Sequence, residues 1–549
     1  MTNKALLEQE RLKYIPILPT ILENLSNLAF EKKQMTEAKA DQEKIQEIFP
    51  QTYGQPLVSL QQGKPSSQER LIIGVVLSGG QAAGGHNVIA GLFDAMKRVH
   101  NESRLIGFLD GPSGVVNGKY CELEEELIDQ YRNTGGFDLI GSGRTKIESE
   151  EQLNKAFSTV KKLQLNGLVI IGGDDSNTNA AILAEYFMQK GLQIKVVGVP
   201  KTIDGDLKNE HVEVSFGFDT ACKTYSEMIG NIARDAISAR KYYHFVKLMG
   251  RSASHIALEC ALQVRPNFTF ISEEVKEKKQ TLEDVVQSLV ELIVKRAEQG
   301  KNYGVILIPE GLIEFIPEMG ELIQDLNKIL ADADESFNQL VIEEKDKKIQ
   351  NRLPSVSLEI FKKLPFSIKK QLLLDRDPHG NVQVSKIATE KLLLDLVEKE
   401  LKTLKEQGKY QGKFNAVEHF FGYEGRSGFP SNFDANYCYA LGMTSLLLIR
   451  EGLTGYMSCV KHLTKHPSEW KISGIPITSL FHLEERHGKT KPVIQKALVE
   501  LKGKPFAQFS KNREEWQFKD AYQFPGPIQF FGPAKISNSI TRTLELEQG

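Results

Sequence analysis

The stretch Leu168-Val-Ile-Ile-Gly-Gly-Asp-Asp-Ser-Asn-Thr-Asn-Ala180 joins an apolar run, two glycines, two carboxylates and the start of a helical pattern. The four apolar residues 168–171 are typical of a buried parallel strand. The glycines turn the chain sharply at the carboxyl end of that strand. Residues 177–183 then predict the first turns of a helix. This order of strand, glycine turn and helix is where open α/β sheets bind their ligands.

The two carboxylates of this stretch, Asp174 and Asp175, limit what the turn can bind. A helix start supplies backbone N–H groups that suit phosphate, but carboxylates repel a bare phosphate unless a cation lies between them. Mg²⁺ held by one or two carboxylates plus phosphate oxygens fits this pattern. The alternative is an acidic first helical turn that the helix dipole favours.

Length and composition restrict the class of protein. With 549 residues the chain exceeds one core, so two or more domains are expected, and a net charge of -2 gives no case for nucleic-acid or anionic-membrane binding. Its five cysteines form no CxxC pair, which argues against a zinc site or a disulfide framework and favours a cytoplasmic location. No apolar run approaches membrane length and the first residues lack signal-peptide features.

Two further apolar runs upstream also end in glycine-rich turns. Residues 71–77 lead into 78–87, whose glycines, Gly80 among them, allow the backbone to approach a charged ligand closely. Residues 104–109 form the next predicted strand, and a Gly-Ser turn with Arg144 follows further on. Arg144 could clamp a phosphate or could simply be solvated.

The strand predicted over 194–199 is followed by Pro200-Lys-Thr-Ile-Asp-Gly-Asp-Leu207. In an extended or turned backbone Asp204 and Asp206 can point the same way, so that one takes a proton while the other orients it or helps to hold a metal. Lys201 offers a compact positive charge for a moving phosphoryl group. The alternative is a polar Asp-Gly turn that satisfies its own backbone.

Later strands repeat the arrangement. A strand from His244 ends in Met-Gly-Arg251, another over 303–308 ends in Pro-Glu-Gly311, and the pattern resumes over 414–428 before a helix at 432–451. Because each predicted strand ends in glycine plus a polar side chain, we expect an α/β protein with two doubly wound, Rossmann-like domains facing a shared cleft.

The predicted organisation has four parts. Residues 1–70 form an N-terminal helical extension, 71–237 the first α/β domain and 238–549 the second, interrupted by a helical insertion at about 313–412. We expect the tail from about Phe506 to be irregular.

The motifs Gly-Gly-Asp-Asp, Pro-Lys-Thr-Ile-Asp-Gly-Asp, Met-Gly-Arg, Pro-Glu-Gly and Gly-Tyr-Glu-Gly-Arg occur here in that order. Together they resemble the phosphofructokinases, specifically the long pyrophosphate-dependent 6-phosphofructokinases, over about residues 71–451. The resemblance implies that 71–237 binds pyrophosphate and 238–549 binds fructose 6-phosphate. It further implies a reversible, Mg²⁺-assisted transfer of a phosphoryl group to the sugar 1-hydroxyl in glycolysis.

Two positions bear on the phosphoryl donor. The ATP-using branch of the family generally carries glycine where this chain has Asp175 and Lys201, whereas the pyrophosphate branch carries Asp and Lys. A carboxylate at 175 would repel the α-phosphate of a nucleotide, and Lys201 adds charge for the shorter donor. The resemblance therefore implies pyrophosphate.

The resemblance also implies residue roles. Asp204 is the expected general base, Asp206 supports it, Lys201 and Asp175 complete the catalytic set, and Asp174 holds Mg²⁺. Gly80 and Arg144 are expected to bind phosphate. The remaining expected substrate contacts are Thr202, Ile203, Lys241, Tyr242, Met249, Gly250, Arg251, Glu310, Tyr423, Glu424, Gly425 and Arg426.

In ATP-using relatives an arginine reaches the sugar 6-phosphate from a neighbouring subunit. The corresponding segment here is Arg240-Lys241-Tyr242, and the sequence alone does not identify which of its side chains makes this contact. A contact across subunits implies a homodimer or a higher homo-oligomer.

Three alternatives remain. An ATP-dependent 6-phosphofructokinase is disfavoured by Asp175 and Lys201. A non-catalytic regulatory subunit would be expected to lose catalytic carboxylates, which this chain keeps at Asp174, Asp204 and Asp206. A lipid or NAD kinase shares the Gly-Gly-Asp turn but not the later motifs.

Overall fold

The computed structural model describes residues 4–64, 69–331, 337, 339–376, 381–486, 489–528, 533 and 538–549. The chain forms two compact units. The first contains residues 1–221, 423–497 and 528–549, and the second contains 222–422 and 498–527.

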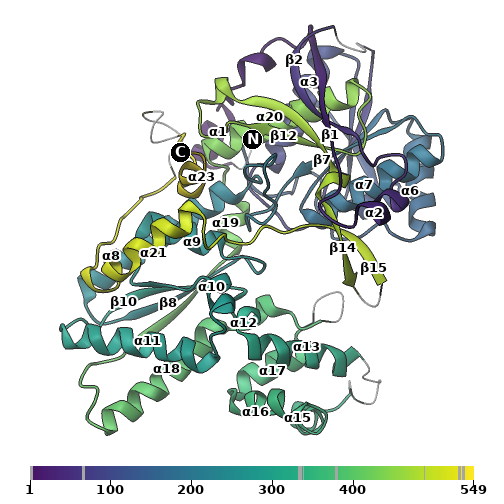
Figure 1. The fold of residues 1–549 in the computed structure, drawn as a ribbon. Helices are drawn as coiled ribbons and strands as arrows, with labels where there is room; N and C mark the ends of the chain where they lie inside the picture. The colour runs from purple at the N-terminus through teal and green to yellow at the C-terminus, as the bar shows by residue number, and fades with distance from the viewer. Residues whose placement is uncertain are drawn as a thin grey trace. The chain divides into compact units, whose positions relative to one another are not determined.

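The first unit is built on a nine-stranded sheet with the strand order β1-β2-β13-β12-β7-β6-β3-β4-β5 (Figure 1). Its central strands run parallel and its edges are antiparallel. The strands are β1 (Leu28–Met35), β2 (Pro56–Gln62), β3 (Ile72–Leu77), β4 (Arg104–Phe108), β5 (Tyr120–Leu123), β6 (Gly167–Gly172), β7 (Lys195–Pro200), β12 (Tyr456–Lys461) and β13 (Lys471–Pro476).

Helices cover both faces of this sheet. On one face α7 packs its alanines and Phe187 against Leu168 and Ile170 of β6. On the other face Ile449 of α20 contacts Gly167. The helices of this unit are α1 (Leu6–Leu12), α2 (Gln42–Ile48), α3 (Gly85–Val99), α4 (Pro112–Asn117), α5 (Glu125–Asp129), α6 (Glu150–Lys162), α7 (Asp174–Gln189), α19 (Tyr423–Ser427), α20 (Asn432–Arg450) and α23 (Arg542–Gln548).

Because both faces are covered, every residue of β6 is buried, which confirms the strand expected from its continuous apolar run. Short 3-10 turns, at Thr20–Leu22, Pro467–Glu469 and Ile477–Leu480, and the antiparallel hairpin of β14 (Phe481–Arg486) and β15 (Lys489–Ile494) complete the unit.

Helices α3 and α20 cross with almost no space between their backbones. A Cβ on Gly91 of α3 would lie 2.2 Å from the carbonyl oxygen of Tyr439, and one on Gly442 of α20 would lie 2.1 Å from the carbonyl oxygen of Val88. Glycine at both positions permits this approach, which fixes the helix that begins directly after the glycine-rich turn of residues 78–84.

The second unit holds a parallel sheet with the order β11-β8-β10-β9. Its strands are β8 (Tyr243–Leu248), β9 (Phe268–Thr269), β10 (Gly304–Pro309) and β11 (Ala416–Phe421). It includes most of α8 (Phe218–Ala239) together with α9 (His255–Val264), α10 (Ser272–Glu277), α11 (Leu282–Glu298) and α21 (Lys504–Lys519).

In the insertion predicted at about 313–412, the regular elements that the structure describes are helices, apart from an isolated bridge between Arg376 and Val382. It comprises α12 (Leu312–Phe315), α13 (Pro317–Ala331), α15 (Ile342–Gln350), α16 (Ser355–Lys363), α17 (Phe366–Leu374), a 3-10 turn at Val384–Lys386 and α18 (Thr389–Glu406). Buried residues of these helices, such as Phe361 and Leu393, share one apolar core with Phe245 and Ile306 of the sheet. The insertion is therefore part of the second unit's core.

Three expectations about the chain are wrong. The N-terminal extension of residues 1–70 is not purely helical, because it contributes β1 and β2. Leu28 and Phe30, two apolar residues of this extension, lie in β1 and gain their partners from β2, which in turn pairs with β13 far along the chain.

The tail from Phe506 is not irregular throughout, since α21 extends to Lys519 and buries Phe506, Phe509 and Trp516, and α23 follows at Arg542–Gln548. The second domain does not run uninterrupted from 238 to 549, because β12 and β13 extend the first unit's sheet by pairing with β7 and β2.

Candidate active site

The turns that follow β3, β6 and β7 meet at one edge of the first sheet. The backbone N–H of Lys201 donates to the carbonyl oxygen of Gly172 at 3.0 Å, and that of Ser78 donates to Ile171 at 2.8 Å. Parallel strands bring the turns at their carboxyl ends to the same edge, as the sequence predicted. The glycine-rich turn, the Gly-Gly-Asp-Asp turn and the Pro-Lys-Thr-Ile-Asp-Gly-Asp turn are therefore neighbours.

Two polar side chains at the start of α7 hold this edge together. The Asn177 side-chain amide donates to the carbonyl oxygens of Gly172 at 2.7 Å and Val199 at 3.4 Å, which ties the helix start to β6 and β7. The Ser176 hydroxyl donates to the Ser78 hydroxyl at 2.8 Å. Sequence reasoning missed both roles, although both residues directly follow the quoted carboxylates.

Cationic groups surround the glycine-rich turn. A Cβ on Gly80 would lie 2.9 Å from one guanidinium nitrogen of Arg426 and 3.5 Å from one of Arg144, and a Cβ on Gly79 would lie 3.4 Å from the Lys201 Nζ. Gly79 also has a φ of 86°, which favours glycine. Three positive groups therefore converge on a turn without side chains, an arrangement suited to a phosphorylated ligand.

The ammonium group of Lys201 lies at the centre of this cluster and is only 6% exposed. Burial lowers its pKa to about 8, an effect that nearby Arg426 and Arg144 reinforce and that the carboxylates of Asp204 and Asp174 oppose. These electrostatic neighbours place Gly80, Arg144, Asp174, Lys201, Asp204 and Arg426 in one site, so six of the predicted residues come together.

The turn after β7 has a defined shape. The backbone N–H of Asp204 donates to the Thr202 hydroxyl at 3.1 Å, and the hydroxyl of Ser215 donates to the carbonyl oxygen of Thr202 at 3.0 Å. Gly205, between Asp204 and Asp206, has a φ of 74°, which favours glycine. Ile203 of this turn is buried.

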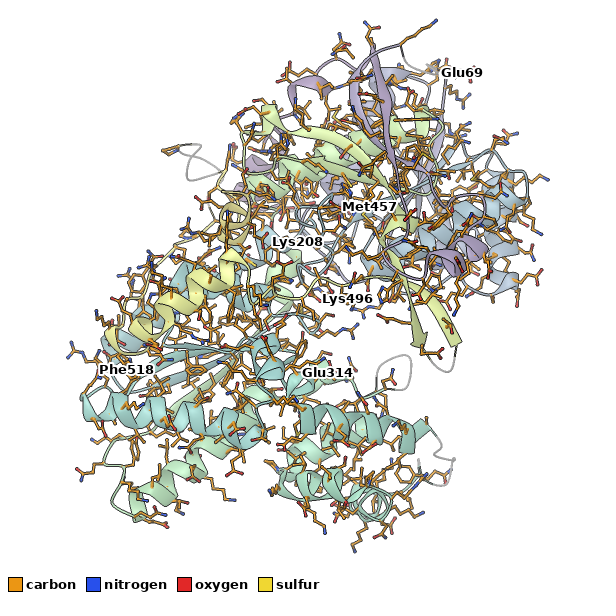
Figure 2. The ribbon with its side chains drawn as sticks, in the orientation of Figure 1. Glu69, Lys208, Glu314, Met457, Lys496 and Phe518 are labelled. Carbon is orange, nitrogen blue, oxygen red and sulfur yellow. The ribbon has the colours of Figure 1, made fainter. Side chains whose placement is uncertain are left out.

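The carboxylates of Asp174 and Asp206 share one cationic neighbour. The Lys496 Nζ lies 3.7 Å from the Asp174 carboxylate and 3.8 Å from the Asp206 carboxylate. Lys496 is on the segment that follows β15 (Figure 2). No sequence motif marked this lysine, because it lies far along the chain from both aspartates.

Asp175 is placed differently from Asp174. Its carboxylate is half-exposed and lies 3.1 Å from the Nζ of Lys146, another residue that the sequence did not single out. The negative charge at position 175 is thus held next to a positive one. Lys146 follows shortly after Arg144 in the same glycine-containing turn.

The donor set suits a hard divalent cation. Asp174 and Asp206 present carboxylate oxygens to one cation, the Lys496 ammonium, which stands where a metal ion would find the same two ligands. Among the residues that the structure describes, no group of three or more His, Cys, Asp or Glu side chains could hold a metal ion. Mg²⁺ is usually bound by only one or two carboxylates with phosphate and water oxygens, so these residues fit it.

A second group of predicted residues lies in the second unit, at the carboxyl ends of β8 and β10. The backbone N–H of Gly250 donates to the Glu310 carboxylate at 2.9 Å, and that of Glu310 donates to Leu248 at 2.9 Å. Gly250 has a φ of 127°. A Cβ on Gly311 would lie 2.0 Å from the carbonyl oxygen of Arg251. Met249, Gly250, Arg251 and Glu310 therefore form one set, as expected.

Lys241 and Tyr242 do not join that set. They precede β8, and the carbonyl oxygen of Tyr242 accepts from the N–H of Gly304, where β10 begins. Met249 follows the opposite end of the same strand. Within the second unit, the six residues of β8 separate the two groups.

Tyr423, Glu424, Gly425 and Arg426, which we assigned to the second domain, lie in the first unit, on the short helix α19. The guanidinium of Arg426 lies 5.2 Å from the centre of the Tyr423 ring, and the hydroxyl of Ser427 donates to the Gln81 side chain at 2.5 Å. Helix α19 therefore packs against the glycine-rich turn, which explains why Arg426 reaches Gly80.

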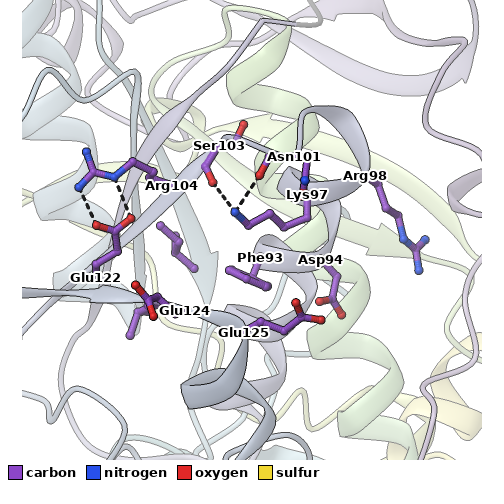
Figure 3. A pocket seen from close by; sticks show the side chains of 12 residues that line it. Phe93, Asp94, Lys97, Arg98, Asn101, Ser103, Arg104, Glu122, Glu124 and Glu125 are labelled. Carbon is purple, nitrogen blue, oxygen red and sulfur yellow. Dashed lines mark hydrogen bonds and ion pairs between the residues drawn. The ribbon is translucent and has the colours of Figure 1, made fainter.

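A separate pocket of about 620 Å³ lies between α3, β4 and β5 of the first unit (Figure 3). None of its lining residues belongs to the predicted site. Its Lys97 donates to the backbone carbonyls of Asn101 and Ser103, and its Arg104 is paired with Glu122 at 2.6 Å. These basic groups are thus engaged within the protein, and we assign the pocket no ligand.

Comparisons with known proteins agree with the fold. A model of the family described as Phosphofructokinase matches residues 72–449. The chain is 52% identical to a protein of Treponema pallidum (strain Nichols) named pyrophosphate–fructose 6-phosphate 1-phosphotransferase, over 99% of this chain and 97% of that protein. It is also 52% identical to the protein of that name from Porphyromonas gingivalis, over 99% of both.

Among solved structures, the chain resembles a protein of Nitrosospira multiformis described as a pyrophosphate-dependent phosphofructokinase, with a TM-score of 0.51 and 16% identity over 75% of this chain and 84% of that one. At this identity the likeness supports the fold alone. The family match and the curated relatives place the chain in the phosphofructokinase family.

Two further observations concern the chain as a whole. In the part of the sequence that the structure describes, no helix combines the length and apolar character that crossing a bilayer requires. None of the five cysteines forms a disulfide, and all but Cys121 are buried.

Proposed function

We propose that this protein transfers a phosphoryl group from pyrophosphate to the 1-hydroxyl of fructose 6-phosphate, giving fructose 1,6-bisphosphate and phosphate. The observation that supports this most is the buried Lys201 ammonium with Asp204 and Asp174 beside it and with Arg144 and Arg426 around it. A base, a carboxylate for a metal ion and three cations for phosphate oxygens are what such a transfer requires. The names of relatives that are about half identical over nearly the full chain point to the same reaction.

The proposed chemistry assigns one task to each group. Asp204 takes the proton from the sugar 1-hydroxyl while the hydroxyl oxygen attacks the nearer phosphorus of pyrophosphate. The bond from that phosphorus to the bridging oxygen then breaks, and phosphate is released. Lys201, Arg144 and Arg426 bind the charged oxygens before and during this step, so their charges are in place when the bond breaks. Asp206 helps to hold the turn that carries Asp204 and faces the same site.

Asp174, with Asp206 beside it, would hold Mg²⁺. When bound, Mg²⁺ neutralises pyrophosphate charge and orients its oxygens. The remaining requirement is orientation of the two substrates, and fixed positioning accounts for much of the rate in such transfers.

We propose that pyrophosphate rather than ATP is the donor. Pyrophosphate lacks the nucleoside part of ATP, and the positive charge of Lys201 gives this shorter donor a binding contact. Asp175 restricts space for a longer donor, and its pairing with Lys146 at 3.1 Å holds it in place. That ion pair also weakens the repulsion between the Asp175 carboxylate and a nucleotide phosphate. Asp175 therefore discriminates against ATP through the space that its side chain fills as well as through its charge.

For the sugar phosphate, we propose that Met249, Gly250, Arg251 and Glu310 form the binding set. Glu310 accepts a hydrogen bond from the backbone of Gly250, which fixes the loop that carries Arg251. Thr202 would contact the sugar beside Asp204. The short helix with Tyr423 and Glu424 presents exposed polar groups, whereas its Arg426 serves the phosphate donor.

We also propose that the enzyme is a homodimer or a higher homo-oligomer. Lys241 and Tyr242 lie at the opposite end of β8 from Met249, so within their own unit they cannot contact a ligand bound by the Met249 set. The exposed Lys241 can instead contact a phosphate bound by a second copy of the chain. Because its five cysteines form no disulfide and its proposed substrates are phosphorylated sugars, we propose that the protein works in the cytoplasm.

A donor comparison tests the proposal. Purified protein is mixed with Mg²⁺, fructose 6-phosphate and either pyrophosphate or ATP, and fructose 1,6-bisphosphate is measured. We expect bisphosphate with pyrophosphate and at least a hundredfold slower formation with ATP. Equal or faster use of ATP would refute the donor assignment, and no product with either donor would refute the reaction.

A further inference from the structure

Lys496 has a fixed place beside the carboxylates of the proposed site. The backbone N–H of Gln495 donates to Leu480 at 3.2 Å, and that of Ala497 donates to the carbonyl oxygen of Asp206 at 2.8 Å. The backbone on either side of Lys496 is therefore tied down, and the second tie attaches it directly to the turn that carries Asp204 and Asp206.

The Lys496 ammonium lies next to two aspartates at once, Asp174 and Asp206. Its distances of 3.7 Å to Asp174 and 3.8 Å to Asp206 exceed the length of an N–H···O hydrogen bond. About a third of its side chain is exposed. The group thus neutralises both carboxylates and is open to an incoming ligand.

We propose that Lys496 is a pyrophosphate-binding residue that occupies the metal position between Asp174 and Asp206 until the substrate arrives. The assignment rests on the proposed function above and adds a residue to its donor site. A divalent cation held by Asp174 would repel the Lys496 ammonium, which would then pair with an oxygen of the pyrophosphate. Its four-carbon stem allows this movement while the tied backbone stays in place.

This arrangement makes metal and pyrophosphate binding cooperative. Before the substrate binds, the ammonium competes with a free divalent cation for the two carboxylates, so the metal alone binds weakly. When pyrophosphate accompanies the metal, the same ammonium gains a charged hydrogen bond instead. Removing the positive charge should therefore strengthen binding of the metal alone and weaken binding of the metal–pyrophosphate complex. A lysine with only a structural role would not move the two affinities in opposite directions.

The test uses the full-length protein with Lys496→Met, which keeps the side-chain length and removes the charge, and Lys496→Arg, which keeps the charge. Lys491→Met is the matched control, because Lys491 lies on β15 and pairs with Glu148 at 2.6 Å, outside the site. Binding of Mn²⁺ alone is measured by electron paramagnetic resonance, and binding of magnesium pyrophosphate is measured by calorimetry.

For Lys496→Met we expect Mn²⁺ to bind about threefold or more tightly than to the wild type, and magnesium pyrophosphate to bind roughly tenfold or more weakly. Lys496→Arg should keep most of the pyrophosphate affinity, and Lys491→Met should match the wild type in both measurements. If both affinities of Lys496→Met are unchanged, or both move in the same direction, the assignment of Lys496 is overturned while the proposed function stands. If the wild type and the Lys491→Met control bind no magnesium pyrophosphate, the proposed function fails together with this assignment.

Discussion

The buried ammonium of Lys201 should give pyrophosphate use a pH dependence that an ordinary lysine would not produce. Burial lowers its pKa from 10.5 to about 8. With that value the group is roughly nine-tenths charged at pH 7 and about one-tenth charged at pH 9. If the charge binds pyrophosphate in the transition state, its contribution should fall about tenfold between these two pH values.

The assay compares kcat/KM for pyrophosphate from pH 6 to 10 in the wild type and in Lys201→Met, which has a similar length and no charge. This ratio of rate constants reports ionisations of the free enzyme and free substrate. Because the ionisations of pyrophosphate and of fructose 6-phosphate affect both proteins alike, dividing one profile by the other leaves the contribution of Lys201.

We expect the wild-type advantage over Lys201→Met to be constant below about pH 7 and to fall with a midpoint near pH 8. An advantage that stays constant to pH 10 would refute the argument, because Lys201 would then keep its proton throughout. No advantage at any pH would show that the charge is not used.

Three further perturbations test the site. Asp204→Ala should lower kcat roughly 10²–10⁴-fold while the dissociation constant of fructose 6-phosphate changes little, and a loss of only a few-fold would remove Asp204 from the role of base. Asp175→Gly combined with Lys201→Gly should weaken pyrophosphate use and begin to admit ATP, and a double variant with its full pyrophosphate rate would contradict the donor argument. Lys201→Met should raise the free energy of unfolding at pH 7 by up to about 3 kcal/mol, as the buried charge is removed. The folded protein loses the Lys201 proton first, so this gain should be full below pH 8 and vanish above about pH 10.5, as denaturant unfolding at several pH values would reveal.

The central strands of the first sheet could be predicted from the sequence because their signal is local. Residues 168–171 are apolar without interruption, since helices cover both faces of β6, and the glycines and aspartates that follow belong to the same few residues. Knowing that parallel strands end at one edge then sufficed to bring Asp174 and Lys201 together.

Features that depend on pairing between distant segments could not be predicted. Strand β1 is the terminal strand of the sheet and pairs with β2, whose own place depends on β13 more than four hundred residues away in the chain. The alternation of apolar and polar residues in these strands is weak, so the sequence around Leu28 and Phe30 is equally compatible with a helix. For the same reason, the sequence did not predict that residues 423–497 belong to the first unit.

The site itself was predicted in part for the same reason. Asp174, Lys201 and Asp204 belong to motifs, whereas Lys496 and Lys146 stand in no motif and acquire meaning only through their distances to Asp174, Asp206 and Asp175. A lone lysine in a polar sequence is ordinarily a solvated surface residue, and only the folded chain distinguishes the two cases.

The proposed phosphoryl transfer can be observed directly by ³¹P nuclear magnetic resonance. The protein is added to Mg²⁺, pyrophosphate and fructose 6-phosphate, and the phosphorus resonances are followed over time. We predict that the pyrophosphate signal declines while orthophosphate and a new phosphomonoester on carbon 1 of the sugar grow in equal amounts. Two orthophosphates for each pyrophosphate with the sugar unchanged would mean simple hydrolysis, and that result would contradict the transfer.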